Sequence, residues 1–161
     1  MSNVRPQMTQ IDPHWTAYLS ALLTPVVAVI GAYIAWRQSR IAQNKLKLDL
    51  FEKRFSVYNK ARNMLGEIMT KGKLTDEGLH EYGAGIREAK WLMDDEVAKY
   101  LGEELWDNAV NLQTYDAELD GKPVGEERTS LVRKRADLKK WFFSQYQVLD
   151  AKVGKFLKLS H

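Results

Sequence analysis

Twenty-two consecutive residues without a charged side chain, Trp15 to Trp36, constrain the fold of this chain more than any other feature. As a helix rising about 1.5 Å per residue, this run is about 33 Å long, enough to cross a hydrocarbon core of roughly 30 Å. Aromatic residues near both ends, including Tyr18 and Tyr33, suit the two membrane interfaces. We therefore predict a transmembrane helix over residues 15–36. A buried core helix is the alternative.

The charges on either side of this run predict its orientation. Arg5 is the only basic residue before it, in residues 1–14, which we expect to form a flexible tail. Under the positive-inside rule, a basic cluster after the run places the tail outside and the rest of the chain in the cytoplasm, with the bacterial inner membrane as the location. The bilayer is then a partner, and four residues are expected at its lipid headgroups: Arg37, Arg40, Lys45 and Lys47.

The predicted membrane helix has two unequal faces. Small residues with a spacing of four, such as Ala28 with Ala32 and Gly31 with Ala35, allow helix backbones to approach closely in lipid. We expect a homo-oligomer whose interface in the membrane consists of Ala21, Thr24, Ala28, Gly31, Ala32 and Ala35. The alternative is that alanine and glycine are simply frequent in membrane helices.

The remaining composition excludes several chemistries. The chain of 161 residues has no cysteine, which rules out disulfides, thiolate metal sites and a cysteine nucleophile. Its net charge is +3, but basic and acidic residues are distributed unevenly along the chain. Residues 37–74 hold ten basic and three acidic residues, residues 75–127 hold four and fifteen, and residues 128–161 hold nine and two. Helices of opposite charge can therefore pack on one another.

Helical periodicity and turn signals predict an all-α fold. The membrane helix continues without interruption to about Met69, and Gly72 ends it. Thr75 is the expected cap of a second helix that ends near Asp94, where Asp94 or Asp95 caps a third. A turn over residues 120–125 precedes a fourth helix that frays or bends near Gly154. Residues 37–158 should thus form an antiparallel bundle of about four helices.

Two arginines fall inside the wide apolar face predicted for residues 46–69. Arg54 and Arg62 either extend their charges past apolar neighbours or pair with acids of the next helices. The other possibility is that they bind an anionic ligand inside the bundle.

The segment after the membrane helix, Lys45-Leu46-Lys47-Leu48-Asp49-Leu50-Phe51-Glu52-Lys53-Arg54-Phe55-Ser56-Val57-Tyr58, resembles the signature of a family of uncharacterised bacterial single-pass membrane proteins. The stretches 87–89, 94–97 and 125–128 resemble later parts of the same family. The resemblance implies the same architecture of one membrane helix and a helical domain. It implies no activity and no catalytic residues.

No constellation typical of an enzyme is evident. His14, His80 and His161 lack partners at metal-ligand spacing, and no phosphate-binding loop or nucleophile motif is present. The acidic cluster at 94–96 could bind a divalent cation, but helix capping explains it more simply. We predict no catalytic, cofactor-binding or metal-binding residues and no cofactor. We also expect no nucleic acid partner, since the basic residues at 133–135 can pair with the acidic helices.

These features favour a non-catalytic, membrane-anchored protein that self-associates, and that perturbs or perforates the membrane as an effector. Its layout resembles the pore-forming accessory proteins of some RNA-targeting CRISPR systems, as an analogy of architecture only. A cryptic enzyme or ligand sensor using Arg54 and Arg62 is one alternative. A monomeric adaptor that holds a cytoplasmic protein partner at the membrane is the other.

Overall fold

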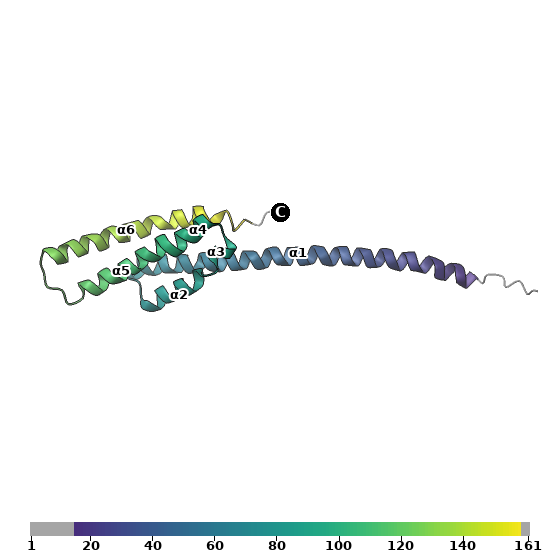
Figure 1. Cartoon of the computed structure of the whole chain (residues 1–161), viewed down its shortest axis with the longest axis horizontal. Helices are drawn as coiled ribbons and strands as arrows, with labels where there is room; N and C mark the ends of the chain where they lie inside the picture. The colour runs from purple at the N-terminus through teal and green to yellow at the C-terminus, as the bar shows by residue number, and fades with distance from the viewer. Residues whose placement is uncertain (1–14, 159–161) are drawn as a thin grey trace, which may run out of the picture. The chain divides into compact units, whose positions relative to one another are not determined.

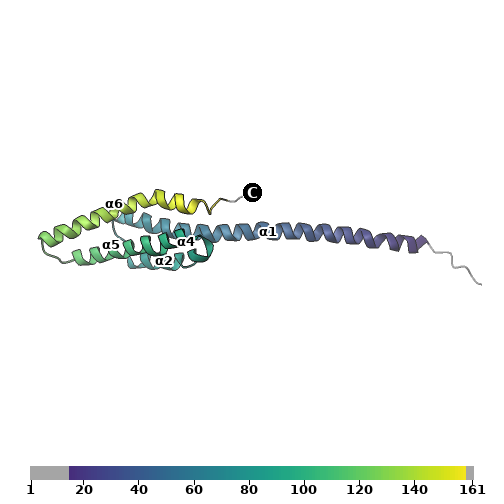
Figure 2. The same cartoon turned by 45° about the horizontal axis from the view of Figure 1, so that its top comes forward.

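The computed structural model describes residues 15–158, and the side chains of Leu23 and of residues 25–158. These residues form helices, shown in Figures 1 and 2, and the predicted all-α class is confirmed. The helices are α1 (Trp15–Lys71), α2 (Asp76–Ile86), α3 (Ala89–Leu92), α4 (Asp95–Lys99), the π-helical turn η1 (Tyr100–Leu105), α5 (Trp106–Leu119) and α6 (Glu126–Gly154). The tail predicted for residues 1–14 lies outside the described residues.

The chain divides into two compact units, residues 1–45 and residues 46–161. The first unit contains the N-terminal part of α1, where every side chain that the structure describes is exposed. No helix among the described residues is both long enough and apolar enough to cross a membrane. The predicted span begins with residues 15–22, whose side chains the structure does not describe, and it stays a prediction.

The second unit is a bundle of four packed helices, as predicted. They are the C-terminal part of α1, then α2, then the continuous helical segment from α4 through η1 to α5, and finally α6. Helices α5 and α6 lie side by side and run in opposite directions (Figures 1 and 2). The largest fully buried side chains of the core are Leu65, Ile68, Tyr82, Val97, Leu101, Leu105, Leu112, Phe142, Leu149 and Val153.

The predicted helix ends are confirmed at three places. Gly72 follows α1 with a φ of 68°, a conformation that suits glycine because it has no Cβ. The Thr75 hydroxyl accepts a hydrogen bond of 3.1 Å from the Gly78 amide at the start of α2. Asp94 caps α4 in the same way, accepting a bond of 2.9 Å from the Val97 amide.

The prediction that the second helix continues to Asp94 is wrong. Helix α2 ends at Ile86, and α3 is a separate single turn that stops at Met93, which has extended backbone. The break lets Ala89 enter the core, where it is 2% exposed.

The third helix contains a π-helical turn, η1, that the sequence analysis did not predict. Apolar side chains recur here every fourth residue, at Val97, Leu101, Leu105 and Ala109, and all four are fully buried. In an α-helix with 3.6 residues per turn, each such step moves the side chain about 40° around the axis. A wider turn in the middle offsets this drift and keeps the four residues on the core face.

The connection between α5 and α6 lies at the predicted turn. Gly121 has a φ of 71° there, again a conformation that favours glycine. Arg128 of α6 holds the turn by donating to the carbonyl oxygens of Leu119, at 3.2 Å, and of Lys122. Helix α6 ends at Gly154, in agreement with the predicted fraying.

Candidate functional site

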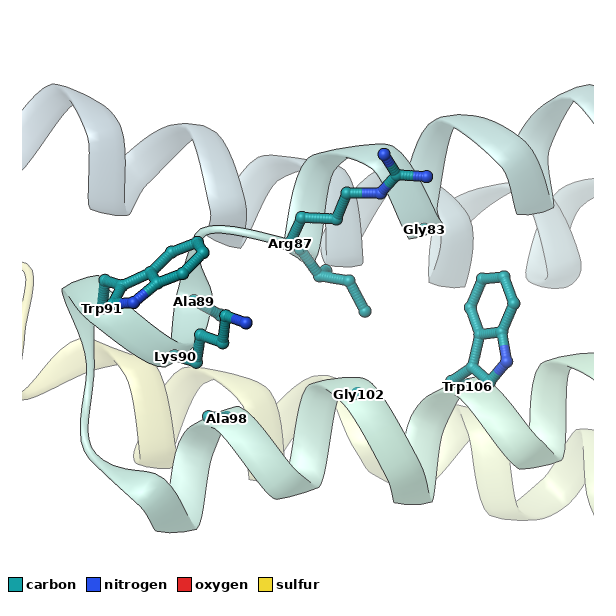
Figure 3. A pocket seen from close by; sticks show the side chains of 9 residues that line it. Gly83, Arg87, Ala89, Lys90, Trp91, Ala98, Gly102 and Trp106 are labelled. Atoms are coloured by element: carbon teal, nitrogen blue, oxygen red, sulfur yellow. The ribbon is translucent and has the colours of Figure 1, made fainter.

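A groove of about 540 Å³ opens on the surface of the bundle, between the end of α2, α3 and the segment from α4 to the start of α5 (Figure 3). This volume lies within the roughly 300–1,000 Å³ that small-molecule sites occupy. The residues that line it are Gly83, Ile86, Arg87, Ala89, Lys90, Trp91, Ala98, Gly102 and Trp106.

Small residues make the groove hollow. Gly83 allows the indole of Trp106 to lie against the α2 backbone, since a Cβ at Gly83 would be only 2.6 Å from that ring. On the opposite wall, a Cβ at Gly102 would meet no atom within 4 Å. With Ala98 one helical turn before Gly102, this wall presents backbone and small side chains to the groove.

Two tryptophans stand at opposite ends of the groove (Figure 3). Trp106 is half-buried and stacks on the core residue Tyr82, with 6.3 Å between ring centroids. Trp91 is 73% exposed, the largest exposed fraction of any aromatic side chain that the structure describes. The Nζ atom of Lys90 lies 4.1 Å from the centre of this indole.

The groove lining carries positive charge. Arg87 and Lys90 are exposed, and neither has a carboxylate within 4 Å among residues 15–158. In Figure 3 the Lys90 amine extends into the groove and the Arg87 guanidinium lies along its upper edge. The nine lining residues include no acid, although Asp95 and Glu103 line a smaller adjoining hollow that Lys90 shares.

Sequence reasoning missed this site. Arg87 entered the sequence analysis only through the family resemblance, and Lys90, Trp91 and Trp106 were not singled out. The sequence offers one clue to the site, a tryptophan that follows a lysine in a segment expected to be helical. It offers no clue to the break between α2 and α3, which brings the residues of the groove together.

Arg54 is engaged by the backbone of the bundle. Its Nε donates to the Leu92 carbonyl at 2.9 Å, and one terminal nitrogen reaches the Phe156 carbonyl at 3.4 Å. The guanidinium also lies 5.6 Å from the Phe156 ring centre. Because these carbonyls are at the end of α3 and just after α6, Arg54 joins three parts of the bundle.

Arg62 lies in a different environment. It is exposed and donates a bond of 3.0 Å to the Tyr58 hydroxyl, which in turn donates to Asp150 of α6 at 2.6 Å. Burial and the bond to Asp150 raise the pKa of Tyr58, so the hydroxyl keeps its proton at neutral pH. The two arginines thus have separate partners, and neither lines the groove.

The acidic cluster at 94–96 is used for capping and ion pairing. Asp94 pairs with Lys155 at 2.7 Å, and Glu96 with Lys152 at 2.5 Å. The bond from Lys155 lowers the pKa of Asp94, and the bond from Lys152 lowers that of Glu96. Across the described residues, no group of three or more potential ligands could hold a metal ion.

The basic residues of α6 partly match the predicted pairing with acidic helices. Arg135 forms an ion pair with Asp116 of α5 and donates to the Gly72 carbonyl at 3.2 Å. Burial, with the nearby Arg135 charge, lowers the pKa of Lys139. The ion pair with Asp116 and the bond to the Gly72 carbonyl give Arg135 a structural role within the bundle.

The residues predicted to contact lipid and to form the membrane interface lie in the first unit, except Lys47, which belongs to the second. Arg37, Arg40, Lys45 and Lys47 are all exposed, and Arg40 lies 4.8 Å from the ring centre of Trp36. The exposed small residues include Gly31, where a Cβ would meet nothing within 4 Å. The others are Ala28, Ala32 and Ala35, while the side chains of Ala21 and Thr24 lie outside the described ones.

Comparisons with family models, with curated proteins and with solved structures found no match to this chain. The resemblance to single-pass membrane proteins therefore stays a prediction from the motif.

Proposed function

We propose that this chain is a membrane-anchored, self-associating helical protein without catalytic activity. In this proposal, residues 15–36 cross the bacterial inner membrane and the bundle lies in the cytoplasm. The observation that carries it is that all the large apolar side chains that the structure describes in the first unit are exposed. They are Leu23, Val26, Val27, Val29, Ile30, Tyr33, Ile34, Trp36 and Ile41, each at least 48% exposed.

Such an apolar surface is costly in water, at about 25 cal/mol for each Å². Monomeric proteins rarely leave a large contiguous apolar patch uncovered, and such patches mark membrane or protein contacts. Lipid supplies a cover for the bulky residues. A second copy of the helix supplies one for the small residues, and an assembly of several copies could perturb or perforate the membrane.

Membrane anchoring is tested by placing a charge in the apolar run. A Val27→Asp variant should lose its resistance to alkaline extraction from the membrane fraction, because a charge at the centre of a spanning helix costs about 2.5–3.5 kcal/mol. The control is Thr129→Asp on the exposed face of α6, which should fractionate as the unaltered protein does. Equal fractionation of both variants, or an unaltered protein absent from the membrane, contradicts the proposal.

Self-association is tested by the mass of the detergent-solubilised particle. Ala28→Leu adds bulk to the small face and should reduce the mass toward that of a monomer, and it should abolish any loss of membrane potential on overexpression. Val29→Leu, on the bulky face, is the matched control and should leave the mass unchanged. A monomeric unaltered protein would eliminate both the oligomer and the pore.

A further inference from the structure

We propose that the groove between α2, α3 and η1 binds a nucleoside phosphate, with the base stacked on Trp91 and the phosphates held by Arg87 and Lys90. This site is separate from the membrane segment, and it does not depend on whether the chain is anchored or self-associates.

Charge is the first support. Arg87 and Lys90 both line the groove, and no carboxylate within 4 Å among residues 15–158 neutralises either one. Some basic side chains elsewhere in the bundle are paired, for example Lys152 and Lys155 with the acidic cluster. Arginine and lysine form charge-assisted hydrogen bonds with phosphate oxygens, which makes an anion the complement of this lining.

The exposed indole is the second support. Tryptophan is among the side chains that gain most from burial, yet Trp91 keeps 73% of its surface in solvent. The Lys90 Nζ lies over the ring, 4.1 Å from its centre. A flat aromatic base can stack on the exposed surface of the Trp91 indole. The neighbouring Lys90 then stays within reach of a phosphate attached to the same ligand. An anion without a ring would leave the indole exposed.

The shape of the groove is the third support. Its volume of about 540 Å³ suits a ligand with the size of a nucleotide. The wall opposite Arg87 is the π-helical turn η1, with Gly102 facing open space. Single π-helical turns within α-helices occur frequently at functional sites. Here the inner side of η1 packs in the core, while Gly102 on its outer side leaves the wall of the groove recessed.

Isothermal titration calorimetry on the purified full-length chain, in detergent micelles, tests the proposal with three probes: ATP, adenosine and tripolyphosphate. ATP should bind with a dissociation constant below about 1 mM, and each of the other two at least about ten-fold more weakly, because each satisfies only one half of the site. Tripolyphosphate that binds as tightly as ATP would overturn the nucleoside assignment. Absence of ATP binding up to about 1 mM would overturn the site.

Variants locate the binding. Trp91→Ala should weaken ATP binding by roughly 5- to 150-fold, the usual loss on removing a stacked aromatic side chain. Arg87→Gln should weaken ATP and leave adenosine unchanged. Gly102→Leu should prevent binding by filling the groove, and the fold tolerates it because a Cβ there meets no other atom within 4 Å. Ala98→Leu fills the same wall and provides a second test.

Two matched controls lie outside the groove. Phe143→Ala removes an aromatic side chain that is 66% exposed on α6, and Lys134→Gln removes an exposed cation of the same helix. Both should bind ATP as the unaltered protein does. Variants are compared only where the thermal unfolding midpoint matches that of the unaltered chain. If the controls lose ATP binding to the same degree as Trp91→Ala and Gly102→Leu, the groove is not the site.

Discussion

Two valines of the same helix show how much the burial of apolar residues differs between the two units. Val27 and Val57 both belong to α1, yet Val27 is 59% exposed and Val57 is 2% exposed. Neither residue type nor secondary structure explains the difference. What distinguishes them is that Val57 belongs to the buried core cluster, to which the other helices of the bundle contribute, so burial in this chain depends on neighbours and not on the helix itself.

The largest expected effect comes from truncating one leucine in each unit. Leu65→Ala should reduce the free energy of unfolding by about 2–5 kcal/mol, because Leu65 is fully buried and its removal leaves a cavity. Leu23→Ala, at a residue 57% exposed, should change it by less than about 0.5 kcal/mol. Urea denaturation followed by far-UV circular dichroism measures both. Similar losses would show that the first unit unfolds together with the bundle.

The second effect separates the two arginines. Arg54→Met should destabilise the bundle by about 1–3 kcal/mol, because the Leu92 carbonyl loses its bond from the guanidinium and a charge-assisted hydrogen bond is stronger than a neutral one. Arg62→Met should cost less than about 1 kcal/mol, since Arg62 is exposed. The same denaturation experiment compares them. If Arg54→Met keeps full stability but abolishes binding of an anion, Arg54 is a ligand residue instead.

The third effect concerns the cap that starts α2. Thr75→Ala should lower the free energy of unfolding by about 1 kcal/mol. The Gly78 amide loses its acceptor, and the Glu67 carboxylate loses the hydrogen bond of 2.8 Å that the Thr75 hydroxyl donates. Thr70→Ala, at an exposed residue of α1, is the control and should be nearly neutral. Thermal unfolding of both variants at one pH gives the comparison. Equal midpoints would show that the cap does not limit stability.

The smallest effect is the acid sensitivity of the ion pairs between α4 and α6. The pKa values of Asp94 and Glu96 lie below their ordinary values of 3.8 and 4.5, so the native state holds protons less tightly than the unfolded state. Their contribution is complete above about pH 4.5 and is lost as the pH falls through the lowered values. Melting temperatures should therefore decrease on acidification.

A double variant, Lys152→Met with Lys155→Met, checks this assignment. It should flatten the dependence of the melting temperature on pH between about pH 5 and pH 3, since both carboxyl groups lose the lysine bonds that contribute most to lowering their pKa values, while the Val97 amide still bonds to Asp94. Lys134→Met is the control and should keep the original slope. A slope that is unchanged in the double variant would show that other carboxyl groups are responsible for the acid sensitivity.

Local signals predicted the helix boundaries well where the chemistry is local. Thr75 and Asp94 are caps whose side chains bond to amides three residues later, and Gly72 and Gly121 have the positive φ that their turns require. The position of Arg54 was only half predictable. Its place in the apolar arc follows from helical periodicity, whereas its acceptors are carbonyls 38 and 102 residues away along the chain.

The groove was beyond prediction for a related reason. It needs the end of α2, the break just before α3 and the π-helical turn at Gly102 to meet, and each of the last two departs from regular α-helix. Both departures follow from packing, which depends on side chains distant in sequence.

Residue order alone thus determined the all-α class, the turns at Gly72 and Gly121, and the long apolar run that includes Val27, because helix propensity, capping and hydrophobicity act within a few residues. Only the packed structure determined which side of each helix is covered, which partners Arg54 holds, and that Arg87, Lys90 and Trp91 share a groove. Those outcomes depend on contacts between segments that are far apart in the sequence. The free energy of each contact depends on residues from several segments, and no local sequence pattern links these residues.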